Sequence, residues 1–215
     1  MLSPVLNKLY IYNCPKIVLL DEHHHHPLIS LEINRCENLE SIRSIQGLTY
    51  LESLEIILCP NLLGIPDLHS QCHSLSRLQI NHCDKITFLP SGFDHLAVVN
   101  SLSLGDFSDK LHSFLSLHGI EKMKNHLHSL ELNGLYHWES IPEEIKHLNV
   151  LNSLQICRFG MKELPLWLTN MSSIRDIGFY CCDELDTEAV LRGAPKQVDV
   201  ISINGGEVFI RKSDG

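Results

Sequence analysis

Apolar residues recur along the chain in one phrase, with leucine at its first and fourth positions, isoleucine at the sixth and cysteine at the ninth. The fourth position falls at Leu9, Leu31, Leu54, Leu78, Leu102, Leu130, Leu154 and Ile177, in steps of 22, 23, 24, 24, 28, 24 and 23 residues. Around this position apolar and polar residues alternate, as they do from Ser53 to Ile57. A period of two indicates a short strand with one buried face. The pattern therefore predicts eight short strands, one in each repeat.

A second apolar pair follows each strand and is often closed by proline. Such segments occur at residues 64–66, 88–90, 140–142 and 163–165. Because proline cannot donate a backbone hydrogen bond but fits the first turn of a helix, we predict short helical turns at 143–148 and 166–168. The longest step, 28 residues between Leu102 and Leu130, predicts a loop on one face of the molecule, often the binding face of such proteins.

A fixed period of this length with this phrase is the signature of leucine-rich repeats. We therefore predict an α/β fold, a leucine-rich repeat solenoid or horseshoe. Its parallel β-sheet would line the concave face, and short helices or irregular turns the convex face. Residues 1–190 would form about eight repeats. Residues 191–215 break the period, and Asn204 with the two glycines after it predicts a β-hairpin that caps the array.

One repeat cannot bury enough apolar surface to fold alone, so the ends of the array carry information. Only five residues precede Leu6, and they contain no polar capping segment. We expect the chain to be the C-terminal part of a longer array or a truncated gene product.

Composition narrows the range of partners. The formal charge is -9 with neutral histidines, so charge alone will not hold the chain on nucleic acid or on an anionic membrane. No apolar stretch is long enough to span a bilayer, and the N-terminus lacks the pattern of a signal peptide. The eight cysteines are then expected to be reduced, which places the protein in the cytoplasm or the nucleus. A solenoid of this kind mostly binds other proteins.

Cysteine and histidine could suggest metal binding or catalysis. Five cysteines share the ninth position of the phrase, where a small side chain can lie inside the turn: Cys14, Cys36, Cys59, Cys83 and Cys182. Stacked repeats place them in a row, and a row cannot surround a tetrahedral zinc ion, so we interpret them as structural and predict no metal site. Cys157 should face solvent on the sheet, where a reactive thiol is conceivable.

The run His23–His26 is expected to be a solvated loop with at most weak metal affinity. Hydrolase, zinc-protease and nucleotide-binding motifs are absent from the sequence, so we expect neither an enzyme nor a cofactor.

The outward half of the strands is the candidate protein-binding surface. The alternation also turns Asn81, Ser103 and Asp106 outward, toward solvent. Tyr10 and Tyr12 share one strand, and the Ile57–Leu58 pair exposes aliphatic surface two strands later, which is the composition of an interface. The predicted binding residues are Tyr10, Tyr12, Glu32, Arg35, Glu55, Ile57, Leu58, Arg77, Gln79, His82, Arg158 and Tyr180.

Four stretches carry a resemblance to a known family: Leu51–Leu62, Ser74–Pro90, Ser140–Leu154 and Glu163–Cys182. They resemble the C-terminal leucine-rich repeats of plant intracellular nucleotide-binding disease resistance proteins. The resemblance implies a part in innate immunity, in which the domain recognises a pathogen effector or a host protein altered by one. It also implies that the domain restrains the nucleotide-binding module of the same receptor.

Two alternatives remain open from the sequence. One is the substrate-recognition part of an F-box ubiquitin ligase, although those repeats usually continue the cysteine with threonine, aspartate and glycine, whereas here Cys59 precedes proline and Cys83 precedes aspartate. The other is a truncated, non-functional paralogue.

Overall fold

The computed structural model describes residues 6–14, 27–42, 45, 48–65, 67–68, 72–90, 92–204 and 206–209. All eight predicted strands are present in it. Their bounds are β1 (Lys8–Tyr12), β2 (Ser30–Asn34), β3 (Ser53–Ile57), β4 (Arg77–Asn81), β5 (Ser101–Gly105), β6 (Ser129–Asn133), β7 (Ser153–Cys157) and β8 (Asp176–Tyr180). Two further strands, β9 (Val200–Ile203) and β10 (Gly206–Phe209), follow near the C-terminal end.

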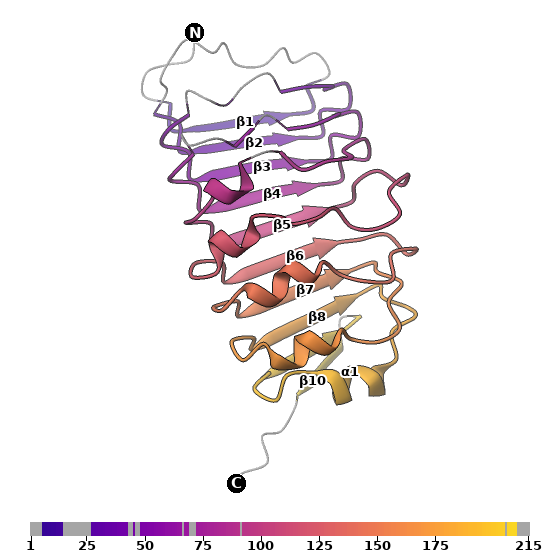
Figure 1. Ribbon diagram of the computed structural model, residues 1–215. Coiled ribbons are helices and arrows are strands. Elements are labelled where there is room, and N and C mark those ends of the chain that lie inside the picture. Colours follow the sequence, from indigo (N-terminus) through magenta and orange to yellow (C-terminus); the bar gives the residue numbers. More distant parts are fainter. Residues whose placement is uncertain are drawn as a thin grey trace.

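The strands stack in chain order into one open sheet, from β1 to β10 (Figure 1). From β1 to β9 every pair is parallel, and equivalent positions of the repeats lie opposite each other, as Leu31, Leu54 and Leu78 do. Just before each strand, one carbonyl accepts two N–H groups from the next repeat. The carbonyl of Glu52, for example, accepts the N–H groups of Ser76 and Arg77, each at 2.9 Å. The predicted solenoid of parallel strands is confirmed.

Alternation within each strand separates a buried face from an open one. In β2, Leu31 and Ile33 are 0% exposed while Glu32 between them is half-buried. The buried positions of all the repeats join one continuous core that runs the length of the described chain. The other face of the sheet carries the side chains that the short helices do not cover, and we call it the open face.

Within the described residues, four short 3₁₀ helices return the chain toward the next strand on the side opposite the open face (Figure 1). They are η1 (Phe93–His95), η2 (Ile120–Met123), η3 (Glu143–His147) and η4 (Leu166–Asn170). Pro142 and Pro165 precede η3 and η4, and Ile145 and Leu168 turn inward from them. The helical turns predicted from the proline positions are thus confirmed.

The long repeat between β5 and β6 folds inward. Phe114 is buried, and its ring contacts the rings of Phe107, Trp138 and Phe159 at centroid distances of 5.8, 5.5 and 5.9 Å. Phe107 and Phe159 occupy the ninth position of the phrase, where other repeats have cysteine. Phenylalanine replaces cysteine here because Phe114, from the extra residues of the long repeat, packs against both rings. Part of the predicted surface loop is therefore core.

The C-terminal end of the array is closed by a different arrangement. The helix α1 (Thr187–Gly193) follows β8, β9 then pairs with β8 in parallel, and β10 turns back antiparallel to β9. The side-chain oxygen of Asn204 accepts the N–H of Cys181 at 2.7 Å, where earlier repeats use a backbone carbonyl. The boundary predicted at residue 190 falls within α1, and the division into two segments stays a prediction.

Replacing Leu54 by alanine tests the register, because this side chain of β3 is 1% exposed inside the stack. We expect a loss of about 2–5 kcal/mol in the free energy of unfolding, measured by urea denaturation. Leu166→Ala is the matched control, since Leu166 is 86% exposed. Equal midpoints for the two variants would contradict the assignment of Leu54 to the core.

Candidate protein-binding surface

The parallel register sorts the open face into rows of equivalent residues. One row runs through the strand centres, where Tyr10 lies opposite Glu32, Glu32 opposite Glu55, and Glu55 opposite Gln79. Neighbouring strands in a sheet lie about 4.8 Å apart, so side chains in one row are within reach of each other. The predicted alternation therefore brings binding candidates from distant parts of the sequence together.

A second row follows the strand ends, where the backbone turns through the left-handed region. The φ angles are 54° at Arg35, 56° at Leu58, 55° at His82, 52° at Asp106 and 58° at Arg158. This conformation costs a non-glycine residue on the order of 1–2 kcal/mol. The turned N–H groups compensate by continuing the sheet, as when Arg35 donates to the carbonyl of Ile57 at 3.0 Å. Because the row uses ordinary residues rather than glycine, the sequence gives no sign of it.

An exposed aromatic pair marks the N-terminal third of the open face. Tyr10 and Tyr12 are 60% and 55% exposed, and the guanidinium of Arg35 lies over the Tyr12 ring at 5.6 Å from its centroid. Ile57 is half-buried, and Leu58 is 36% exposed. We call the surface of β1 to β4 the N-terminal patch. It contains the predicted residues Tyr10, Tyr12, Glu32, Arg35, Glu55, Ile57, Leu58, Arg77 and Gln79.

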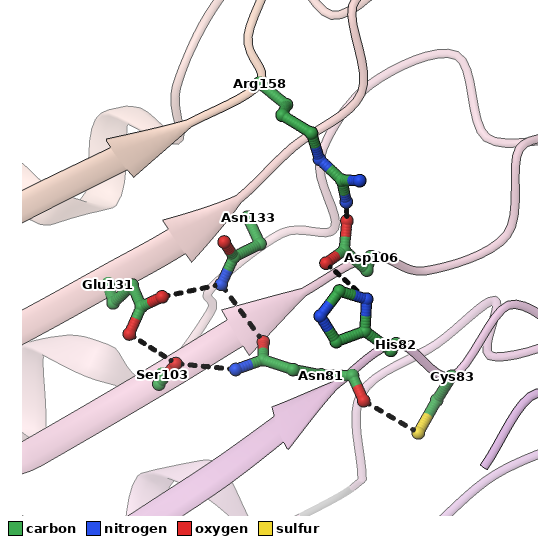
Figure 2. Close-up of polar contacts among 8 residues, drawn as sticks. All are labelled: Asn81, His82, Cys83, Ser103, Asp106, Glu131, Asn133 and Arg158. Atoms are coloured by element: carbon green, nitrogen blue, oxygen red, sulfur yellow. Dashed lines mark hydrogen bonds and ion pairs between the residues drawn. The ribbon is translucent and has the colours of Figure 1, made fainter. Parts of the chain in front are cut away.

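The centre of the open face is occupied by a hydrogen-bonded network (Figure 2). Asn81 donates to the Ser103 hydroxyl at 2.7 Å, and Ser103 donates to Glu131 at 3.0 Å. Asn133 closes the network by donating to Asn81 at 3.3 Å and to Glu131 at 3.0 Å. Each of these side chains is therefore engaged with others of the same chain.

The burial of three polar residues on the open face corrects one expectation. Asn81, Ser103 and Asp106 were predicted to face solvent, but they are only 3%, 9% and 5% exposed. The alternation gave their direction correctly, since they project from the open face. Lateral contacts across repeats then bury them, and an alternation pattern contains no information on such contacts.

Asp106 joins residues from three repeats. Its carboxylate contacts Nδ1 of His82 at 2.9 Å and forms an ion pair with the guanidinium of Arg158, whose side chain reaches past the intervening repeat (Figure 2). That repeat supplies Gly134 at the corresponding position, where an added Cβ would come within 2.5 Å of the Phe159 ring. Burial, and then the positive charge of Arg158, lowers the pKa of His82. The imidazole of His82 and the guanidinium of Arg158 therefore lie against the same buried carboxylate.

Two of the twelve predicted binding residues, His82 and Arg158, thus contact Asp106 of the same chain. A third, Tyr180, is half-buried on β8 and lies apart from the N-terminal patch. Asp106 was not among the twelve predicted binding residues, although its carboxylate contacts both His82 and Arg158. The repeat phrase contains no signal for this pairing, because Asp106 and Arg158 lie 52 residues apart in the chain.

The five cysteines of the phrase occupy the positions expected for a structural role. Each thiol donates to the carbonyl two residues earlier, at 3.4 Å in Cys14, 3.6 Å in Cys36, and 3.5 Å in Cys59, Cys83 and Cys182. Burial raises the pKa of Cys59 to about 11 and that of Cys83 to about 12. Each thiol thus adds a hydrogen bond at the turn, in most repeats to a carbonyl that also accepts a backbone N–H, as the Ile57 carbonyl does from Arg35, so the structural interpretation is confirmed.

The surroundings of Cys157 disfavour a reactive thiolate. It is half-buried on the open face, and burial followed by the negative charge of Glu131 raises its pKa to about 12. Within the described residues, no group of three or more histidine, cysteine, aspartate or glutamate side chains could hold a metal ion. The histidine run His23–His26 lies outside the described residues. No helix in the described part of the chain is long and apolar enough to cross a membrane.

No protein-family model matches the chain. Among curated proteins, "Disease resistance protein RPP4" from Arabidopsis thaliana is 29% identical over 127 residues, which cover 55% of this chain and 11% of that protein. Among solved structures, an internalin from Listeria monocytogenes matches with a TM-score of 0.50 and 20% identity, covering 81% of this chain and 54% of the internalin chain. The internalin supports the fold alone.

The molecule is a leucine-rich repeat domain, as its stacked parallel strands and its likeness to the internalin show. In sequence it is similar to a plant disease resistance protein, and the resemblance stated from the repeat phrase is confirmed. The chain corresponds to only a small part of that relative, so the activity of the whole relative does not transfer directly.

The ion-pair group of Asp106 should contribute to stability. Asp106→Asn keeps the size of the side chain but leaves Arg158 without a counter-charge, so we expect a loss of about 2 kcal/mol in urea denaturation. The exposed Asp109→Asn is the control, with an expected change below about 0.5 kcal/mol. An unchanged midpoint for Asp106→Asn would show that the Arg158 contact contributes nothing.

Thiol reactivity checks the cysteine row. With iodoacetamide at about pH 8, we expect the exposed Cys181 to be alkylated first, and Cys36, Cys59 and Cys83 only after unfolding, because they are buried. Mass spectrometry of the digested protein would give each rate. Alkylation of native Cys83 as fast as that of Cys181 would contradict this interpretation.

Proposed function

We propose that the N-terminal patch is the site at which this domain binds a partner protein. The observation that carries the proposal is the exposure of Tyr10 and Tyr12, at 60% and 55%, on a face that is otherwise mostly polar. Aromatic residues beside arginine are the usual anchors of protein interfaces. The half-buried Ile57 and the exposed Leu58 extend the apolar surface, and Glu32 and Arg77 form part of a polar rim.

The rigidity of the site favours binding. Tyr10 and Tyr12 lie on a strand paired in full register with β2, and a tyrosine side chain loses little conformational entropy when a partner covers it. Arg35 already lies over Tyr12, which holds this ring in place.

The patch differs from the centre of the open face. Asn81, Ser103 and Asp106 already have partners within the chain, so a ligand would have to replace contacts rather than add them. Breaking hydrogen bonds to form new ones contributes little net affinity. We therefore assign the affinity to the N-terminal patch and treat His82 and Arg158 as part of the support of the surface.

The biological role that we propose is recognition in plant defence. Similarity to a protein named for disease resistance supports this role, and the repeat architecture supports protein binding. In this proposal the domain acts inside the cell, binds a pathogen effector or a host protein altered by one, and restrains the nucleotide-binding module of the same receptor. The formal charge of -9 argues against nucleic acid as a partner.

The double variant Tyr10→Ala with Tyr12→Ala tests the site. Against a panel of candidate effector and host proteins, an interactor of the wild-type chain should bind the double variant about 10- to 100-fold more weakly, as measured by biolayer interferometry. The far-ultraviolet circular dichroism spectrum should stay unchanged.

The matched control is Tyr136→Ala, which removes a tyrosine of similar exposure, 58%, outside the strands. This control should bind as the wild type does. Undiminished affinity of the double variant for every interactor would remove the N-terminal patch from the binding site.

A further inference from the structure

A groove lies between η2 and η3, on the helix-bearing side of the sheet and away from the open face. Its volume is about 680 Å³, and it opens widely to solvent. It is lined by His118, Glu121, Lys122, Lys124, Glu144, Lys146, His147 and Asn149. The binding surface proposed above uses none of these residues.

Local sequence explains why charged side chains gather here. Ile120 and Met123 of η2 are buried, so the lysines beside them, Lys122 and Lys124, are left exposed. In η3 the buried Ile145 has the same effect on Lys146. The carbonyl of Lys124 accepts the N–H of Asn149 at 3.2 Å, which ties the two walls together.

The residues that line the groove carry a net positive charge, whereas the whole chain carries a net negative charge. Its three lysines and two glutamates give a net charge of +1 with neutral histidines, whereas the whole chain carries -9. Lys146 pairs with Glu143 at 2.6 Å, and Glu144 accepts a hydrogen bond from Ser116 at 2.7 Å. Within the described residues, neither Lys122 nor Lys124 forms an ion pair. Two ammonium groups on one wall, at the end of η2, are therefore available to a ligand.

The electrostatic effect of these side chains is visible in a neighbouring carboxylate. The hydrogen bond from Lys146, and then its charge, lowers the pKa of Glu143, with a smaller contribution from His147. Lys146 thus already stabilises one carboxylate at the edge of the groove.

We propose that this groove binds an acidic segment of a partner protein, as a second interaction surface independent of the N-terminal patch. An extended segment with spaced carboxylates can place them beside Lys122 and Lys124 and keep its backbone N–H groups close to Glu121 and Glu144. A compact anion such as phosphate fits less well, because the same two glutamates repel it from the lining. The open shape also suits a chain that lies along the surface.

The probe is a fluorescein-labelled peptide of about twelve residues in which glutamate alternates with serine. Its fluorescence anisotropy would be followed at about 50 mM salt, where screening is weak. The triple variant Lys122→Gln, Lys124→Gln and Lys146→Gln should bind the peptide at least tenfold more weakly than the wild type. The control is Lys85→Gln, Lys110→Gln and Lys162→Gln, which makes the same change in net charge at exposed lysines elsewhere and should alter the affinity less than twofold.

Three results would overturn the proposal. Equal loss in the two triple variants would mean attraction by net charge alone. Absence of peptide binding by the wild-type chain would remove the site. Displacement of the peptide by low millimolar inorganic phosphate would indicate a simple anion site. The variant Tyr10→Ala with Tyr12→Ala should bind the probe as the wild type does, so failure here is distinguishable from failure of the N-terminal patch. Thermal unfolding of each variant would confirm that it is folded.

Discussion

Parallel pairing between repeats is the constraint on which the rest of the structure depends. Each strand of five residues is too short to be stable alone, and it acquires its hydrogen bonds and its core contacts from neighbours. The doubly accepting carbonyls, such as that of Glu52, fix the register before each strand begins. Because the register is constant, every position of the phrase becomes a row across the molecule. The cysteine row, the left-handed row and the rows of the open face are consequences of that pairing.

The periodic part of the fold could be predicted because burial repeats with the sequence. Leu31 and Ile33 are buried as the alternation requires, and Pro142 and Pro165 mark helical turns because proline restricts the backbone at the residue that precedes each of them. The left-handed turn at Leu58 could not be predicted, since a leucine there has no intrinsic preference for positive φ. It is imposed by the hydrogen bond from its N–H to the carbonyl of Asn81 in the next repeat.

Contacts between residues two repeats apart could not be predicted from the sequence either. Arg158 and Asp106 lie 52 positions apart in the chain and two repeats apart in space, and nothing in the repeat phrase links them. The longest repeat is similar: its extra residues suggested a loop, yet Phe114 turns inward to meet Trp138. A length difference shows that a repeat is irregular. Whether the extra residues pack or project is decided by the apolar residues among them.

The centre of the open face and the N-terminal patch therefore differ in their capacity to bind a partner. In the centre, the polar groups of Asn81, Ser103 and Glu131 satisfy each other, so covering them would remove water without offering new partners. In the N-terminal patch, tyrosine rings project from a rigid strand, and their burial by a partner would release ordered water from apolar surface. The hydrogen bonds at the centre fix the side chains of the surface, and the patch keeps exposed apolar area whose burial would favour binding. This division follows from the physical chemistry of the exposed groups, and it is the reason why we propose β1 to β4 as the site of recognition.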